Sequence, residues 1–379
     1  MNYLIFEYQI EGHYIEFFRH LLNYAITHKK KDIFFIASSY LLKKWVDDSY
    51  FPESENFKFI YLNKKIVDKL NRSGKIGNLY ASIYRCKILK QLINKYSINK
   101  TILITLVKFF PFLPLIISRR SYISGIEYII PYWRKNIISV PKRFEDKFRI
   151  WLYAHASALK NVYLLNDDKT PEIYNKDYNT NKFKFLPDPI DCLVTPQILN
   201  KKDDKIILLH AGRFRKEKGT FLITTALKEL TDQERKKIKF ILCGSSIIKE
   251  DNDRAFRDMA ELSSIMETEF YNDFVQEGFL HSLYVKSDFI LIPYFNYYQS
   301  SGNLGHAASY GKPIIGPSQG LLGYLIDKYN LGYSLHNLDV DSLVIILKKI
   351  INNPFIGNYN YNEYVKRCCP DRFAEILLS

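Results

Sequence analysis

Residues 208–219 read Leu208-Leu209-His210-Ala211-Gly212-Arg213-Phe214-Arg215-Lys216-Glu217-Lys218-Gly219. An apolar strand therefore runs into a glycine, a cationic turn follows, and a helix starts near the second glycine. Gly212 lets the backbone turn tightly or approach a ligand closely. Arg213 and Lys218 can converge on one anion beyond the carboxyl end of the strand, where open parallel sheets bind ligands. Charge alone favours the plainer interpretation, a solvated cationic turn between strand and helix.

A second stretch, residues 297–313, reads Tyr297-Tyr298-Gln299-Ser300-Ser301-Gly302-Asn303-Leu304-Gly305-His306-Ala307-Ala308-Ser309-Tyr310-Gly311-Lys312-Pro313. Ser300 or Ser301 is a natural N-cap for a short helix, and Gly311 and Pro313 end it. The free N–H groups and the positive dipole end of this helix would form a seat for a phosphate. A small-residue helix packed against a sheet is the alternative interpretation.

Apolar runs of strand length alternate with runs of helical spacing along the whole chain, which favours parallel sheets with crossover helices. The predicted strands are residues 3–8, 32–37, 57–62, 102–106, 206–210, 238–243, 269–275 and 289–293. The predicted helices include residues 12–28, 80–96, 254–267 and 279–286. The fold class is therefore α/β, with two doubly wound, Rossmann-like domains.

A polar, proline-containing break near residues 187–204 separates the two domains. Two prolines fix an extended backbone in Leu186-Pro187-Asp188-Pro189-Ile190-Asp191, and the polar run Lys201-Lys202-Asp203-Asp204 follows. We predict an N-terminal domain, a hinge, a C-terminal domain and a C-terminal helix that packs back on the N-terminal domain. Their ranges are residues 1–190, 191–204, 205–355 and 356–379.

Composition excludes several classes of protein. The chain has 379 residues, of which 47% are apolar and 25% charged, so disorder is excluded. Five scattered cysteines without a CxxC pair predict reduced thiols, neither a disulfide scaffold nor a structural zinc site. The net charge of +14 lies wholly in residues 1–190, which hold 31 Lys and Arg against 17 Asp and Glu. This asymmetry suits an anionic membrane surface or nucleic acid.

The order, separation and flanks of the two quoted stretches resemble the donor domain of GT-B glycosyltransferases, specifically the retaining GT4-like group (glycosyl transferases group 1). Members carry four motifs in order. The first is Gly-Arg, a cationic turn and Lys-Gly, and the second is Ser-Asp before an apolar strand that ends in proline. The third is a glycine-rich loop followed by a helix and Gly-x-Pro, and the fourth is a glycine loop before a helix. The matching segments here are Gly212 to Gly219, Ser287 to Pro293, Gly302 to Pro313 and Gln319 to Leu322. The resemblance is close over about 205–335 and loose over 1–190, where Gly12-His13 stands in place of the family's first glycine loop.

The resemblance implies two Rossmann-like domains facing each other across a cleft, with the donor against the C-terminal domain. It implies that Arg213 and Lys218 are catalytic, because they would bind the diphosphate and offset the charge that grows as the glycosidic bond breaks. The donor-binding residues that it implies are Gly212, Phe274, Val275, Ser301, Gly302, Asn303, Leu304 and His306. The acceptor-side residues are Gly12 and His13, and neither a metal nor another cofactor is required.

The sequence departs from the family pattern at two glutamates that are usually eight residues apart. Tyr298 stands in place of the earlier one, which often contacts the donor sugar, and a tyrosine cannot copy a carboxylate. His306 stands in place of the later one, which commonly holds the ribose hydroxyls, and a histidine can also hydrogen-bond them. The family's histidine after the fifth strand of the N-terminal domain is also not evident in residues 126–132, Ile-Glu-Tyr-Ile-Ile-Pro-Tyr.

The expected function is a metal-independent, hexosyltransferase-like enzyme. It would move a sugar from a nucleotide diphosphate sugar to a hydroxyl of a glycan or lipid-linked glycan, in cell-surface polysaccharide or lipopolysaccharide synthesis. The expected location is the cytoplasm or the inner face of the cytoplasmic membrane. A catalytically degenerate GT-B subunit that binds a partner enzyme or a glycan is the alternative, and the missing glutamates fit it.

Two other classes fit the sequence less well. A nucleic-acid-binding protein suits the basic half, but no recognition motif is present, so we expect no nucleic acid partner. A nicotinamide dehydrogenase suits the doubly wound pattern, but no GxGxxG follows the first strand.

Three further features of the sequence each have two interpretations. The segment 108–114 with Arg119-Arg120, and the basic helix from Tyr80 to Lys100, suit an anionic bilayer interface; burial of 109–114 beneath its own domain is the other interpretation. The acidic pairs Asp339-Val340-Asp341 and Asp251-Asn252-Asp253 predict helix starts rather than metal ligands. His210 is either near the site or a capped core histidine.

Overall fold

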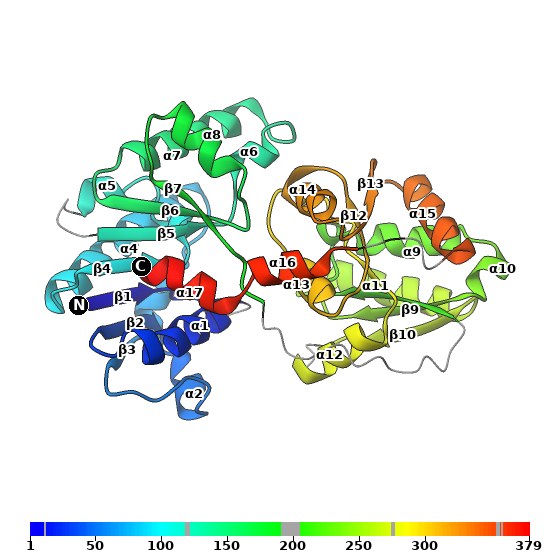
Figure 1. The fold of residues 1–379 in the computed structure, drawn as a ribbon, viewed down its shortest axis with the longest axis horizontal. Coiled ribbons are helices and arrows are strands. Elements are labelled where there is room, and N and C mark those ends of the chain that lie inside the picture. Colours follow the sequence, from blue (N-terminus) through cyan, green and yellow to red (C-terminus); the bar gives the residue numbers. More distant parts are fainter. Residues whose placement is uncertain (11–12, 118–121, 191–204, 274–276, 354–356, 358) are drawn as a thin grey trace. The chain divides into compact units, whose positions relative to one another are not determined.

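The computed structural model describes residues 1–379 except 11–12, 118–121, 191–204, 274–276, 354–356 and 358. The chain folds into two compact units, and each is described by itself. Unit 1 consists of Met1–Pro189 and Cys369–Ser379, and unit 2 consists of Ile190–Cys368. Figure 1 shows that each unit is a sheet covered by helices. The predicted hinge, residues 191–204, lies outside the described residues.

Unit 1 is built on a parallel sheet of seven strands in the order β3-β2-β1-β4-β5-β6-β7. The strands are β1 (Asn2–Phe6), β2 (Ile33–Ser39), β3 (Phe57–Leu62), β4 (Lys100–Leu103), β5 (Tyr122–Glu127), β6 (Leu159–Leu165) and β7 (Phe183–Leu186). Strand β1 pairs with β2 on one side and with β4 on the other, each time in parallel register. Because the chain leaves β1 in one direction across the sheet and later continues from β4 in the other, the order reverses between these two strands.

Helices cover both faces of this sheet. They are α1 (His13–His28), α2 (Leu42–Asp47), α3 (Lys64–Leu70), α4 (Lys75–Lys95), η1 (Leu106–Phe109), α5 (Leu113–Ile116), α6 (Pro131–Arg134), α7 (Val140–His155), α8 (Thr170–Asp177) and α17 (Pro370–Leu378). Helix α17 lies beside α1 (Figure 1), with the Phe17 and Phe373 rings 4.8 Å apart. The hydroxyl of Tyr3 on β1 donates to the carbonyl of Leu378 at 3.2 Å. The last helix of the chain therefore completes the core of unit 1.

Unit 2 repeats the architecture with a parallel sheet of six strands in the order β10-β9-β8-β11-β12-β13. The strands are β8 (Ile206–Ala211), β9 (Ile238–Cys243), β10 (Glu267–Tyr271), β11 (Phe289–Leu291), β12 (Ile314–Pro317) and β13 (Gly332–Leu335). Its helices are η2 (Lys216–Lys218), α9 (Thr220–Lys228), α10 (Asp232–Arg235), α11 (Lys249–Ser263), α12 (Glu277–Lys286), α13 (Gly302–Ser309), α14 (Gly320–Lys328), α15 (Val340–Asn352) and α16 (Tyr361–Arg367).

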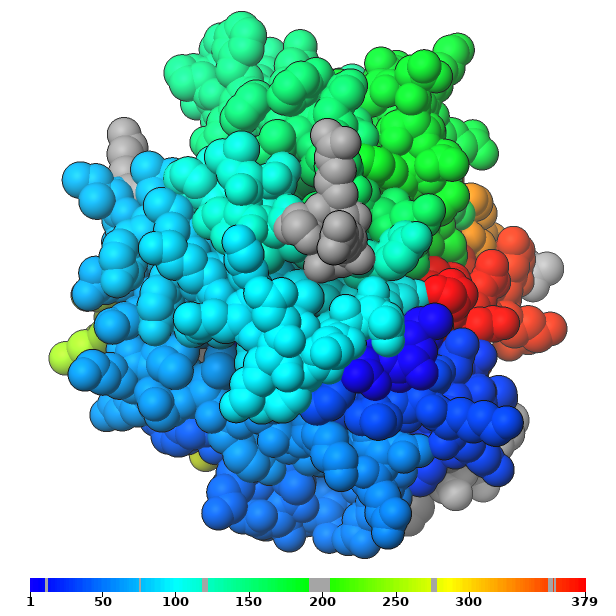
Figure 2. All heavy atoms as spheres, turned by 90° about the vertical axis from the view of Figure 1, so that its left-hand side faces the viewer, coloured from blue at the N-terminus to red at the C-terminus, as the bar shows by residue number. Residues whose placement is uncertain are grey.

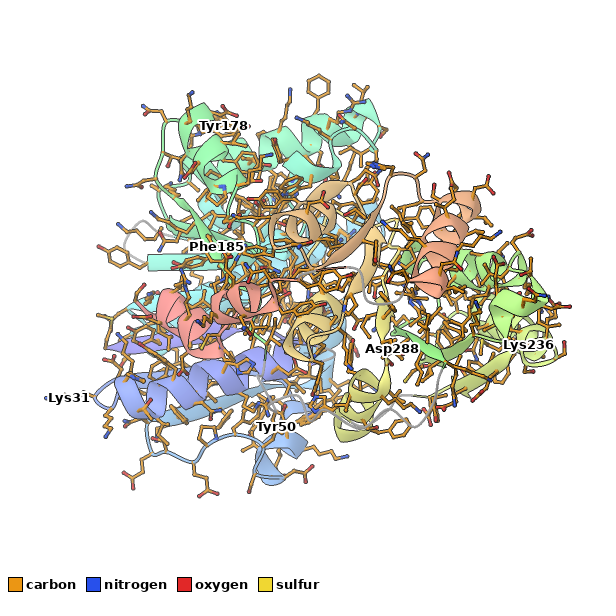
Figure 3. All side chains as sticks on the ribbon, turned by 45° about the vertical axis from the view of Figure 1, so that its right-hand side comes forward. Lys31, Tyr50, Tyr178, Phe185, Lys236 and Asp288 are labelled. Carbon is orange, nitrogen blue, oxygen red and sulfur yellow. The ribbon has the colours of Figure 1, made fainter. Side chains whose placement is uncertain are left out.

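The predicted fold class is confirmed: both sheets are parallel and doubly wound, with crossover helices between their strands. Strand β11 is the short central one, and Asp288 fixes its start against β8. The Asp288 carboxylate accepts from the Ile207 N–H at 2.7 Å, and the Asp288 N–H donates to the Ile207 carbonyl at 2.8 Å. Figure 3 labels this residue in unit 2. The Ser-Asp pair of the sequence therefore aligns the two central strands of unit 2.

Two sequence-based expectations about unit 1 have a clear outcome. The aromatic run 109–114 is mostly turned inward, with Phe109 and Leu113 only 2% and 3% exposed, which favours burial over a bilayer contact. Arg119-Arg120 lie outside the described residues. Within the described ranges, no helix is long and apolar enough to cross a membrane.

Candidate functional site

The switch point of the unit 2 sheet, where the strand order reverses, lies between β8 and β11. The chain leaves β8 toward β9 and leaves β11 toward β12, so the connections after these two strands diverge to opposite faces of the sheet. Ligands of open parallel sheets bind at such a switch point, outside the carboxyl ends of the strands. The segments that follow β8 and β11 are the two stretches that the sequence singled out.

The cationic turn after β8 is packed against the segment after β11. Gly219 has a φ of +70°, and a Cβ on it would lie 2.3 Å from the Pro293 carbonyl oxygen, so only glycine fits. The Phe295 N–H donates to the Glu217 carbonyl at 2.9 Å. The turn therefore cannot swing away as an independent solvated loop.

His210, at the end of β8, also holds the cationic turn in place. Its Nδ1 hydrogen-bonds the Leu291 carbonyl at 2.8 Å and its Nε2 hydrogen-bonds the Thr220 hydroxyl at 3.0 Å. Burial lowers the pKa of His210 to about 4, so the ring is neutral and donates from Nδ1. The Thr220 oxygen in turn accepts from the Arg215 N–H at 3.3 Å. His210 is therefore a capped core histidine, which was one of its two sequence interpretations.

Lys218 projects from the turn onto an aromatic ring. Its Nζ lies 3.9 Å from the centre of the Tyr294 ring, and the side chain is half-buried. Burial and, after it, the neighbouring charges of Arg213 and Arg215 lower the pKa of Lys218 to about 8. Within the described residues no carboxylate forms an ion pair with Lys218. Three cations thus gather at this edge, and an anion placed among them would relieve their repulsion.

The start of α13 meets this cationic turn at the carboxyl end of β8. Asn303, in the first turn of α13, donates from Nδ2 to the Ala211 carbonyl at 2.5 Å and to the Tyr294 hydroxyl oxygen at 2.8 Å. Burial raises the pKa of Tyr294 to about 12, while hydrogen bonds from Asn303 and Ser301 oppose the rise. Tyr294 therefore contacts both Lys218 and the α13 N-terminus.

Ser301 occupies the N-cap position of α13, but its side chain makes no cap hydrogen bond to the first turn. Leu304 donates its N–H to the Ser301 carbonyl at 3.0 Å, which leaves the N–H groups of Gly302 and Asn303 at the open end of the helix. At the other end Gly311 adopts a φ of +62°, as a left-handed C-terminal residue does. The predicted short helix and both of its boundaries are confirmed.

The structure brings most of the predicted donor-side residues of unit 2 together. Gly212 has a φ of +124°, and a Cβ on it would lie 3.8 Å from Asn303 Nδ2. Leu304 is buried. His306 lies one turn further along α13, with its ring 5.6 Å from Tyr284 and 6.3 Å from His281 of α12. Phe274 and Val275 lie outside the described residues.

For the predicted acceptor-side residues the structure gives little support. Gly12 lies outside the described residues, and His13 opens α1 with an exposed side chain that meets Glu16 at 3.4 Å. The acidic pairs occupy helix starts as predicted: Asp339 caps α15 by accepting from the Ser342 N–H at 2.8 Å, and Asp251 lies in the first turn of α11. Over the described residues, no three His, Cys, Asp or Glu side chains are placed to hold a metal ion.

A polar cluster that the sequence analysis missed lies at the corresponding switch point of unit 1. Glu7 follows β1 and is only 2% exposed, and Lys108 follows β4. Lys108 Nζ lies 3.3 Å from Glu7 Oε1 and donates to the Gln9 side-chain oxygen. It also lies over the rings of Tyr8 and Tyr14, at 4.6 and 5.4 Å from their centres. We call these five residues the unit 1 cluster.

The unit 1 cluster is held by a buried arginine. Arg85 donates to the Lys108 carbonyl at 2.8 Å and lies 5.3 Å from the centre of the Tyr8 ring. Burial lowers the pKa of Lys108, and the Glu7 carboxylate opposes that shift. The sequence does contain a signal for this cluster. Polar residues follow two apolar strands, as they do in the two stretches that the sequence analysis singled out in unit 2. The sequence analysis placed Lys108 in a segment with two interpretations, a bilayer interface or burial, and its contacts with Glu7 and Gln9 favour the second.

The family model for glycosyl transferases group 1 matches residues 194–367. Unit 2 is a glycosyl transferases group 1 domain. The matched range contains the cationic turn, the switch point between β8 and β11 and the whole of α13. Among curated proteins, no sequence matches the chain.

Solved structures of glycosyltransferases share the fold of this group 1 domain and of unit 1. A glycosyltransferase from Rickettsia africae ESF-5 has a TM-score of 0.63 at 12% identity, over 100% of this chain and 93% of the other. WaaG, a glycosyltransferase involved in lipopolysaccharide biosynthesis, has a TM-score of 0.68 at 14% identity, over 100% and 99%. Anabaena Alr3699/HepE in complex with UDP-glucose has a TM-score of 0.68 at 12% identity, over 100% and 98%. At these identities the likeness shows the fold, which is GT-B.

Proposed function

We propose that this chain is a retaining glycosyltransferase that moves a sugar, a hexose in particular, from a nucleotide diphosphate sugar to a hydroxyl group. The observation that carries this proposal is Lys218, a half-buried ammonium with no carboxylate partner among the described residues, beside Arg213 and next to the open end of α13. A site that gathers cations beside the open N-terminus of a helix fits an anionic ligand. The group 1 domain match and the UDP-glucose bound to HepE support a nucleotide sugar as that ligand.

The chemistry follows from where charge develops. As the bond between the anomeric carbon and the diphosphate oxygen breaks, negative charge builds on the leaving diphosphate. Preorganised cations at that position stabilise the transition state more than the ground state. Lys218 and Arg213 supply the charge that a divalent ion would otherwise provide, so the proposed reaction needs no metal. Gly302 and Asn303 add backbone N–H groups, and His306 would reach the ribose.

The acceptor belongs on unit 1 in this proposal. The unit 1 cluster offers a carboxylate at Glu7, an amide at Gln9 and an ammonium at Lys108, which together can accept and donate hydrogen bonds to sugar hydroxyls. It follows β1 and β4 at the switch point of its own sheet, as the cationic turn does in unit 2. We propose a glycan or lipid-linked glycan of cell-surface polysaccharide or lipopolysaccharide synthesis as the acceptor. The involvement of WaaG in lipopolysaccharide biosynthesis supports this pathway.

The net charge of residues 1–190 supports a place at the inner face of the cytoplasmic membrane, because +14 suits an anionic leaflet.

A second candidate function rests on a different observation. Tyr298 and His306 stand where the family carries glutamates, which favours a degenerate subunit that binds a nucleotide, a glycan or a partner enzyme without transfer.

A thermal-shift panel of UDP, GDP, ADP and CMP tests the donor site, because a ligand that binds only the folded state raises the melting temperature. We expect one nucleoside diphosphate to raise it, and the Lys218→Met variant to lose that shift while Lys216→Met, in the same turn but exposed, keeps it. Incubation with the matching sugar nucleotides then separates the two functions. Release of sugar or its transfer supports the enzyme, and binding without either supports the degenerate subunit. No shift with any nucleotide overturns the enzyme and leaves only a subunit that binds a glycan or a partner enzyme.

A further inference from the structure

Helix α7 of unit 1 presents a row of bare apolar side chains to solvent. Val140, Phe144, Phe148 and Trp151 are 56%, 68%, 51% and 47% exposed. Their spacing of four, four and three residues places them on one stripe of the helix. Figure 2 shows the green segment that contains α7 at the top of the visible surface. Contiguous exposed apolar surface of this kind marks a site of interaction.

The opposite face of α7 is locked into unit 1, so the apolar row cannot turn inward. That face buries Asp146, Arg149, Ile150, Tyr153 and Ala154. Asp146 accepts from Arg134 Nε at 2.9 Å and Nη2 at 2.5 Å, and from Arg149 at 3.3 Å. A rotation of the helix would break these buried ion pairs, which is costly.

The rings of the row are organised rather than scattered. Phe148 and Trp151 stack with ring centres 6.0 Å apart, and Trp151 stacks on His155 at 4.9 Å. Phe110, from the segment before α5, meets Phe148 edge-on at 5.8 Å from beneath. The row is therefore a preformed ridge of aromatic rings, whose outer edges remain uncovered by the described residues of unit 1.

Basic residues flank this ridge. Arg143 and Lys147 are exposed and lie on the same side of the stripe at helical spacing. The exposed acid of the helix, Glu145, is paired with Lys142 at 2.7 Å. The whole surplus of +14 charges in the chain belongs to residues 1–190. An aromatic stripe bordered by basic side chains, for which the described residues provide no ion pair, suits the interface of an anionic bilayer, where rings enter the headgroup layer and cations meet lipid phosphates.

We propose that the outer face of α7 docks unit 1 on an anionic phospholipid bilayer, with Phe144, Phe148 and Trp151 inserted at headgroup depth. A protein partner would have to offer a groove that fits the ridge and acidic side chains that match its basic residues. An anionic bilayer offers an apolar layer for the rings and anionic headgroups for the basic residues without any such match in shape. The docking segment thus differs from the one that the sequence suggested around residues 108–114. This inference does not depend on sugar transfer, because none of the residues of the row or of its flanking charges belongs to the unit 1 cluster or to the cationic turn of unit 2.

Sedimentation of the full-length protein with lipid vesicles tests the proposal. We expect binding to phosphatidylcholine vesicles containing phosphatidylglycerol, weakened by salt as the Debye length shortens, and little binding to phosphatidylcholine alone. The triple variant F144S/F148S/W151S should reduce the partition coefficient by roughly tenfold or more. The single variant F144S, at the most exposed position, should give an intermediate loss and keeps the test valid if the triple variant unfolds.

Ile247→Ser is the matched control, since Ile247 is 83% exposed on unit 2 and should leave vesicle binding unchanged. Charge reversal in R143E/K147E should weaken binding to anionic vesicles alone. Equal binding of F144S and the unaltered protein, or no binding of the unaltered protein to anionic vesicles, overturns the proposal. So does a concentration-dependent dimer in sedimentation velocity that the triple variant abolishes, because the row would then belong to a second copy of the chain.

Discussion

The ammonium group of Lys218 lies over the face of the Tyr294 ring, 3.9 Å from its centre, while the hydroxyl of the same ring accepts from Asn303. One buried ring thus joins the cationic turn after β8 to the first turn of α13. A cation over an aromatic face is held without being neutralised, so the charge stays available to a ligand. This arrangement pre-positions Lys218 before any diphosphate arrives.

Replacing Lys218 by alanine should lower turnover by roughly 10²–10³, the scale for loss of one charge-stabilising group, with the fold intact. The measurement is the initial rate of sugar transfer or of sugar-nucleotide hydrolysis, with far-UV circular dichroism as the check on folding. Lys216→Ala removes an exposed lysine of the same turn and should leave turnover within about threefold. Near-normal activity of a folded Lys218→Ala protein would remove Lys218 from the mechanism.

Nucleotide affinity should fall as the pH rises through about 8. Burial, with the charges of Arg213 and Arg215, lowers the pKa of Lys218 to about 8, so the ammonium is charged below that pH and lost above it. A bound diphosphate favours the charged form and raises this pKa, so binding near pH 8.5 should take up a proton. Calorimetry in two buffers of different ionisation enthalpy measures that proton.

The matched control for this pH effect is the Lys218→Met protein, whose residual affinity should show no step near pH 8. Titration of other groups would leave the same step in both proteins, and that result would assign the pH dependence elsewhere.

Gly219→Ala should destabilise the protein by about 1–3 kcal/mol or more. The position combines a φ of +70° with a Pro293 carbonyl oxygen only 2.3 Å from the site of the new Cβ, and a backbone atom cannot move aside cheaply. Urea unfolding followed by circular dichroism measures the change. Gly278→Ala is the control: it lies in α12 with nothing within 4 Å of the new Cβ, so its effect should stay within about 1 kcal/mol.

The sequence predicted eight of the described strands, most of which are short apolar runs bounded by turn residues. It placed β10 at residues 269–275 rather than Glu267–Tyr271, and it missed β5, β6, β7, β12 and β13. It also predicted the helix from Gly302 to Ser309, since a serine, a glycine and a proline mark its two ends. Helix starts were less accurate: α4 begins at Lys75 rather than near Tyr80, and α11 at Lys249 rather than residue 254. Polar first turns carry no apolar periodicity, so these starts are invisible to a hydrophobic pattern.

Contacts between distant segments that the family resemblance does not mark could not be predicted. Glu7 and Lys108 are 101 residues apart, and only the strand order brings β1 beside β4. The same holds for the outer face of α7. The periodicity of α7 shows apolar residues on two sides of the helix. The sequence alone does not indicate that the side with Asp146 and Arg149 is the buried one. A carboxylate and a guanidinium usually lie at the surface, and only their pairing with each other makes this burial tolerable.

Asp146→Ala should destabilise unit 1 by about 3–5 kcal/mol, because it leaves Arg134 and Arg149 buried without their shared carboxylate. Glu145→Ala, one residue away, is the matched control; its exposed pair with Lys142 is worth about 0–1 kcal/mol. Tryptophan fluorescence is the right probe, because all three tryptophans, Trp45, Trp133 and Trp151, lie in unit 1. A urea midpoint that Asp146→Ala leaves unchanged would mean that apolar packing alone holds α7, and the orientation of its outer face would then need another cause.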